Sequence, residues 1–132
     1  MYDEIYGQAK KSIFIVDNYI GLKTLEKLIN IKDGVDVSIF SDNLVKGLRQ
    51  STYVDFCKEY PNLNIQLFYS GGVFHDRYII LDYGTNDEKI FLCGASSKDA
   101  GGRITSILED PDRKKYDFMI KDMLKNKQLM LK

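Results

Sequence analysis

The sequence predicts an α/β domain built on a mixed parallel and antiparallel sheet flanked by helices, and three observations lead to this prediction. In the first half of the 132-residue chain, short runs rich in β-branched and aromatic residues alternate with segments of helical periodicity. In the second half, the loops between the apolar runs are too short to hold a crossover helix. The length suits one hydrophobic core. We therefore expect a single domain over residues 1–132, either as a whole protein or as a piece of a longer one.

The first half of the chain predicts three parallel strands joined by helices. Strands are expected at residues 12–19, 35–41 and 65–69. An apolar stripe at helical spacing predicts a helix over residues 22–29, and a longer helix is expected over residues 44–60, ending before a proline. A strand-helix-strand-helix-strand order favours parallel pairing with right-handed crossovers.

The second half predicts strands that pair more locally. Residues 78–83 (YIILDY) and 89–93 (KIFLC) are continuous apolar runs, as expected for central strands covered on both faces. Residues 103–108 could add one more strand. Gly71-Gly72 and residues 84–87 separate strands too closely for a crossover helix, so these two joins must be hairpins or tight loops.

The end of the chain predicts an amphipathic helix. Asp110 followed by Pro111 is a typical helix start, and apolar residues recur at helical spacing over residues 116–124. Residues 112–132 also hold seven Lys and Arg against three Asp, an excess of four positive charges. We interpret this excess as a solvated helix face, and contact with nucleic acid is the alternative.

Composition and charge exclude several classes of protein. Nineteen basic and nineteen acidic residues give no net charge, so any anion site must be local. No apolar run approaches the roughly 20 residues of a membrane span, and the N-terminus lacks the apolar core of a signal peptide, so we expect a cytoplasmic protein without a membrane partner. Cys57 and Cys93 lack the spacing of a zinc or disulfide framework, so we expect buried thiols.

The single histidine, His75, is the first candidate for chemistry. It stands directly before a predicted central strand, in GGVFHDRYIILD. A lone histidine is usually a surface or core residue, but His75 and Arg77 should point to the same face, which joins an imidazole to a cation suited to phosphate. Asp76 would face away. Asp82, at the far end of this strand, either belongs to the site or closes the strand before the turn at Gly84.

The next strand leads into a turn of small and polar residues, in KIFLCGASSKDAGG. Small residues let backbone N–H groups approach an oxyanion, and Ser96 and Lys98 can donate hydrogen bonds to phosphate. Such a stretch is also typical of an ordinary turn. Two adjacent strands that both end in groups suited to an anion favour a phosphate site.

These residues resemble the signature of the phospholipase D superfamily, which is His-x-Lys, four residues, Asp and, further on, Gly-Ser-x-Asn. The frame from His75 to Asp82 matches it, with Arg77 in place of the lysine. In the second element Ser96 matches the serine, Lys98 stands at the asparagine position, and Asp99 is one step out of register. The order of the upstream strands is also similar to that of single-motif members, so the likeness covers nearly the whole chain.

The resemblance implies a phospholipase D-like fold and a metal-independent phosphodiesterase, most plausibly a nuclease, that needs no cofactor. It implies that His75 is the nucleophile or the acid, that Arg77 holds the phosphate, that Ser96 and Lys98 are supporting donors, and that Asp82 orders the site. The family uses two histidines, and one chain has one, so the resemblance implies a homodimer that places two copies of His75 across a shared cleft.

Further polar residues are candidates for support. Glu109 could orient an imidazole by accepting its second N–H, and Asp99 could also assist. Two Asp-Asn pairs, at positions 17–18 and 42–43, should follow the first two strands. There they would either rim the same cleft or cap helices.

Two other functions remain open at the level of sequence. The chain could be a catalytically degenerate module that binds phosphate or nucleic acid, or that serves dimerisation. It could also be a structural domain in which the histidine belongs to the core.

Overall fold

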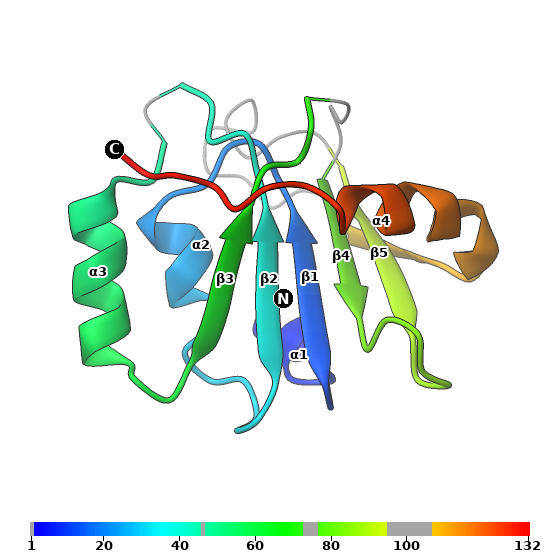
Figure 1. The fold of residues 1–132 in the computed structure, drawn as a ribbon. Helices are drawn as coiled ribbons and strands as arrows, with labels where there is room; N and C mark the ends of the chain where they lie inside the picture. The colour runs from blue at the N-terminus through cyan, green and yellow to red at the C-terminus, as the bar shows by residue number, and fades with distance from the viewer. Residues whose placement is uncertain (1, 46, 73–76, 95–106) are drawn as a thin grey trace.

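The computed structural model describes residues 2–45, 47–72, 77–94 and 107–132 (Figure 1). The elements in chain order are α1 (Tyr2–Tyr6), β1 (Ser12–Val16), α2 (Leu22–Glu26), β2 (Asp36–Phe40), α3 (Gln50–Glu59), β3 (Asn64–Phe68), β4 (Arg77–Leu81), β5 (Lys89–Cys93), β6 (Ile107–Asp110), the 3₁₀ helix η1 (Arg113–Tyr116) and α4 (Asp117–Met123).

The six strands in the described part of the chain form one sheet, in the order β3-β2-β1-β4-β5-β6. β1 is parallel to β2, and β2 is parallel to β3, because α2 and α3 supply the crossovers that parallel neighbours need. β4 runs antiparallel to β1, and β5 and β6 continue in antiparallel fashion. The predicted α/β fold with a mixed sheet is therefore confirmed.

Helices cover both faces of this sheet. One core contains side chains from α1, α2 and α3, including Tyr6, Leu25 and Phe56. The other core lies under η1 and α4, where Ile120 and Met123 pack with residues of the central strands. In Figure 1 α4 and the C-terminal segment cross the front of the sheet, and α1 lies behind it. Burial on both faces explains why the central strands are continuous apolar runs.

The helix predicted over residues 44–60 begins later than expected, at Gln50. Asn43 and Val45 have φ angles of 53° and 62°, in the left-handed region that a right-handed helix cannot contain. The Asn43 side chain accepts from the Leu48 N–H at 2.7 Å and donates to the Leu48 carbonyl at 2.9 Å, which holds this loop. The apolar residues Leu44 and Val45 are exposed, so the helical spacing that includes them does not mark a buried helix face.

The start predicted for the last helix is also wrong. Asp110 ends β6, and the chain becomes helical only at Arg113, in η1. The Asp110 carboxylate instead accepts hydrogen bonds from the Tyr116 hydroxyl at 2.6 Å and the Asp112 N–H at 2.9 Å. It also pairs with the Lys115 ammonium at 2.7 Å. Of the strand predicted over residues 103–108, only the last two residues are described, and both lie in β6.

The N-terminal elements differ from the predictions. The short helix α1 was not predicted, and β1 ends at Val16 rather than at residue 19. Cys93 is buried and Cys57 is half-buried, and both are free thiols. In the part of the chain that the structure describes, no helix is long and apolar enough to cross a membrane.

Candidate functional site

The strand directions bring several chain segments to one edge of the sheet. β1, β2 and β3 end at this edge, and β4 begins there because it runs antiparallel to β1, with Val16 opposite Tyr78. β5 ends there as well, since its last residue, Cys93, lies opposite Arg77. The start of β4 and the end of β5, which adjoin the two segments of the predicted motif, are therefore direct neighbours.

Four of the seven predicted site residues lie outside the described residues. This holds for His75, Ser96, Lys98 and Asp99. In the sequence, residues 73–76 come directly before Arg77 and residues 95–106 directly after β5 and Gly94. Both segments therefore join the described chain at the same edge of the sheet.

Arg77 is buried at this edge and forms an ion pair. Its Nη1 atom lies 3.7 Å from Oδ2 of Asp17, and the two side chains are only 9% and 12% exposed. Asp17 follows β1 directly, and its Oδ1 accepts a hydrogen bond from the Tyr19 N–H at 2.9 Å. A guanidinium and a carboxylate this deeply buried need each other, since an uncompensated buried charge is costly.

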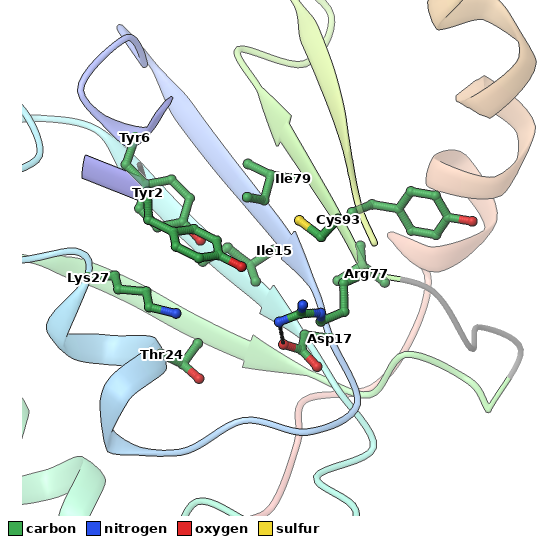
Figure 2. Close-up of a pocket in the computed structure, with 11 residues that line it drawn as sticks. Tyr2, Tyr6, Ile15, Asp17, Thr24, Lys27, Arg77, Ile79 and Cys93 are labelled. Carbon is green, nitrogen blue, oxygen red and sulfur yellow. Dashed lines mark ion pairs between the residues drawn. The ribbon is translucent and has the colours of Figure 1, made fainter. Parts of the chain in front are cut away.

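Arg77 and Asp17 line a small pocket, the Arg77 pocket, on the side of the sheet covered by α1 and α2 (Figure 2). Its volume is about 30 Å³. Its polar lining comes from β1 and β4, the two helices and the end of β5: Tyr2, Tyr6, Asp17, Thr24, Lys27, Arg77 and Cys93. The ammonium of Lys27 lies 3.9 Å from the centre of the Tyr2 ring, as expected for a cation–π contact.

Burial shifts the pKa values of three groups in this pocket. It raises the pKa of Asp17 above its ordinary value, although the hydrogen bond from the Tyr19 N–H and the charge of Arg77 act in the opposite direction. Burial also lowers the pKa of Lys27, and repulsion from Arg77 adds to this. The pKa of the Cys93 thiol is raised, again by burial first, so Cys93 is a protonated thiol and a poor nucleophile near neutral pH.

Asp82 lies at the other end of β4, and the structure does not bring it to Arg77. Five residue steps along an extended strand separate them by roughly 16 Å. The Asp82 carboxylate is buried and accepts hydrogen bonds from the backbone N–H groups of Lys10, Lys11 and Ser12, the closest at 2.7 Å. Its contacts therefore hold the segment between α1 and β1 and match the strand-closing alternative.

Hydrogen bonds from the side chains after β1 and β2 connect the loops at the edge of the sheet where Arg77 lies. Asn18 Oδ1 accepts from the Asp42 N–H at 2.9 Å and from the Ser70 hydroxyl at 2.5 Å. Asp42 Oδ1 in turn accepts from the N–H groups of Ser70 and Gly71 at 3.1 and 3.2 Å. These side chains therefore join the loops that follow β1, β2 and β3.

The second alternative, helix capping, is wrong for positions 17–18 and 42–43. The residues that precede α2 and α3 are Gly21 and Arg49. Glu109 is exposed in β6, opposite Phe91 and two strands away from β4.

Sequence reasoning missed Lys27, Tyr2 and Thr24 as neighbours of Arg77. Tyr2 and Thr24 lie on helices and Lys27 directly follows α2, all far from residue 77 in the sequence, and none belongs to a motif. Only the order of the strands, which places β4 beside β1, brings them together. In the described ranges, no cluster of three or more His, Cys, Asp and Glu side chains is arranged to hold a metal ion.

Comparisons with known proteins give matches among solved structures. No protein-family model matches the chain, and no curated protein sequence matches it. NucT from Helicobacter pylori is similar over 97% of this chain and 88% of its own, with a TM-score of 0.63 and 16% identity.

A second similar structure is that of TrmBL2, described as an archaeal chromatin protein with a novel mode of DNA binding. It matches 96% of this chain with a TM-score of 0.57 and 16% identity, and this chain spans about half (48%) of TrmBL2. At these identities the similarities show the fold alone: this chain has a mixed α/β fold similar to that of NucT.

Proposed function

We propose that this protein is a metal-independent phosphodiesterase of the phospholipase D type that cleaves nucleic acid. His75 forms a covalent phosphohistidine in a cleft that two copies of the chain share. The observation that carries the proposal is the pairing of Arg77 with Cys93, which joins both segments of the predicted motif to one edge of the sheet.

The comparisons support this proposal at the level of the fold. The chain is similar to NucT from Helicobacter pylori over 97% of its own length and 88% of that of NucT. The sequence frame from His75 to Asp82 resembles the signature of the phospholipase D superfamily. The mixed α/β fold agrees with the fold that this resemblance implies, and the motif supports the reaction class.

The proposed reaction has two steps. In the first, the neutral imidazole of one His75 attacks phosphorus, a P–N bond forms, and the P–O bond to the leaving oxygen breaks as the second copy's protonated His75 donates its proton to that oxygen. In the second, water attacks phosphorus, the P–N bond breaks, and the water's proton passes to the second copy's His75. An ordinary histidine pKa near 6.5 allows both protonation states near neutral pH.

In both steps a cation beside the phosphorus stabilises the reacting group. The phosphorus gathers negative charge on its oxygens as the bonds change, and a fixed guanidinium such as Arg77 stabilises that charge. Ser96 and Lys98 would add further donors. The homodimer is required because one chain contains one histidine.

One observation favours a second function, nucleic-acid binding without turnover. Arg77 already has a carboxylate partner, Asp17, at 3.7 Å, and phosphate must compete with it. An arginine that is buried and paired is a less available clamp than the family's lysine. TrmBL2, about half of which this chain spans, is described as a chromatin protein with a novel mode of DNA binding.

Hydrolysis in EDTA tests the proposal directly. Wild type should cleave single-stranded DNA or an activated phosphodiester with EDTA present, and His75→Ala should lower the rate by about 10²–10⁴-fold or more. Lys114→Ala, which removes an exposed charge from η1, is the control and should retain activity. DNA binding that depends on His75 without any cleavage would favour the second function, and cleavage by His75→Ala would exclude His75 from the reaction.

A mixing experiment tests the shared cleft. If two copies of His75 act together, coexpression of wild type and His75→Ala in equal amounts leaves about a quarter of the dimers active. If each chain acts alone, about half of the activity remains. Sedimentation of the same samples shows whether dimers form.

A further inference from the structure

Among the described residues that line the Arg77 pocket, positive charge exceeds negative charge. Two of these side chains, Arg77 and Lys27, are basic, and one, Asp17, is acidic. The Lys27 ammonium stands over the Tyr2 ring at 3.9 Å, and within the described ranges no carboxylate lies in ion-pair distance of it. The ring holds the cation at the pocket without neutralising its charge.

The cations come from different parts of the chain and converge. Lys27 directly follows α2, whereas Arg77 begins β4, and Figure 2 shows both side chains reaching toward Asp17. The hydroxyls of Thr24 and Tyr2 belong to the same lining. Ammonium, guanidinium and hydroxyl groups are donors that suit a phosphate oxygen.

The size of the pocket restricts what can enter. A volume of about 30 Å³ has room for about two water-sized groups. The two non-bridging oxygens of a phosphodiester have this size, whereas a sugar or a base is much larger. The charge and the volume are therefore both compatible with the two non-bridging oxygens of a phosphodiester.

We propose that the Arg77 pocket binds one phosphate group, with Lys27 as a second phosphate-binding residue besides Arg77. The incoming oxygens replace Asp17 as the partner of Arg77, and Lys27 offsets the repulsion from the Asp17 carboxylate. When the phosphate belongs to a nucleic acid strand, this inference rests on the proposed function and adds a binding residue to it. Free inorganic phosphate has the same chemistry.

The test compares two lysines at neighbouring turns. Lys27→Met removes the cation of the pocket, and Lys23→Met removes the same charge from an exposed position on α2 that does not line the pocket. The affinity for a fluorescent single-stranded oligonucleotide is measured at several salt concentrations. Lys27→Met should weaken binding several-fold and flatten the plot of log K against log salt by about 0.7, the loss of one phosphate contact.

Two further measurements complete the design. Inorganic phosphate should bind wild type, which isothermal titration can detect, and should bind Lys27→Met at least several-fold more weakly. Lys27→Arg keeps the positive charge and the contact with Tyr2, so it should restore most of the affinity and of the salt dependence. Thermal unfolding of each variant identifies any loss of folding.

The outcomes separate this inference from the proposed function. Equal behaviour of folded Lys27→Met and Lys23→Met would overturn the inference, while cleavage of nucleic acid by wild type would leave the proposed function intact. Binding of inorganic phosphate through Lys27 without any oligonucleotide binding would support the pocket and contradict the proposed function.

Discussion

Arg77 begins β4 and Asp82 directly follows it, and both residues are buried. Their contacts differ. Among the described residues, Arg77 pairs with the Asp17 carboxylate at 3.7 Å and lines the Arg77 pocket. The Asp82 carboxylate accepts hydrogen bonds from three backbone N–H groups. The sequence motif contains both residues, yet the contacts of Asp82 support the fold, whereas Arg77 lines a pocket.

Asp82→Ala should destabilise the fold by about 3 kcal/mol, because it leaves the N–H groups of Lys10, Lys11 and Ser12 without their acceptor. Alanine also fits poorly at the φ angle of 53° that Asp82 adopts. Asp82→Asn keeps an acceptor oxygen and tolerates this angle, so it should cost clearly less. Urea unfolding measures both values, and equal midpoints for Asp82→Ala and wild type would contradict the assignment.

The same carboxylate predicts a pH dependence. Burial by itself raises the pKa of Asp82, but the hydrogen bonds from Lys11, Ser12 and Lys10 lower it below its ordinary value. A lowered pKa stabilises the fold fully above the unfolded-state value near 3.9, and this stability is lost as the pH falls through the lower folded-state pKa. Asp82→Asn should therefore lose less stability than wild type between about pH 5 and pH 2, as unfolding curves in that range would measure.

At the scale of elements, the segment after α4 protects an edge of the sheet. Its backbone pairs with β3 through the N–H of Leu129 and the carbonyl of Leu67 at 3.0 Å, and through the N–H of Tyr69 and the carbonyl of Lys127 at 2.9 Å. In Figure 1 this segment runs from α4 across the sheet toward α3. An uncovered strand edge can pair with other chains, so this segment also opposes aggregation.

Leu129→Ala should destabilise the protein by about 2–3 kcal/mol, because Leu129 is buried in the core under α1, α2 and α3. The neighbouring Met130 is 73% exposed. Met130→Ala is therefore the matched control and should change stability by less than about 0.5 kcal/mol. Denaturant unfolding of the two variants measures the difference, and similar losses would show that the segment does not pack as described.

At the scale of the whole molecule, one sheet separates two cores. β1 and β4 lie in its centre, and each has a strand on both sides. β6 is an edge strand in which Leu108 is 66% exposed. Local opening should therefore be easiest at β6 and rarest at the centre.

Amide hydrogen exchange should follow this order. The amides of β1 and β4 should exchange about tenfold or more slowly than the hydrogen-bonded amides of β6. Nuclear magnetic resonance or mass spectrometry can measure these rates. Protection of β6 equal to that of β1 would indicate that something covers this edge in solution, and a second copy of the chain is then the first partner to test.

Much of the fold follows from local pattern. The strand runs, the crossover lengths and the short loops predicted the first five strands and the mixed parallel and antiparallel character of the sheet, and the strand offered at residues 103–108 overlaps β6 at its last two residues. The helix boundaries near Gln50 and Arg113 were wrong, because the positive φ angles at Asn43 and Val45 and the contacts of Asp110 are decided by neighbours that the local sequence does not show. The functions of His75 and of its dimer remain predictions.

The positions of the strands, the motif that contains Arg77 and the balance of basic and acidic residues can be read from the amino-acid sequence alone. That Arg77 pairs with Asp17 and lines the same pocket as Lys27 depends on the order of the strands, which follows from the faces that can be buried together and not from local propensity. For the same reason, Asp82 took its place with the backbone of residues 10–12 rather than with Arg77: a strand holds its two ends apart whatever motif spans them.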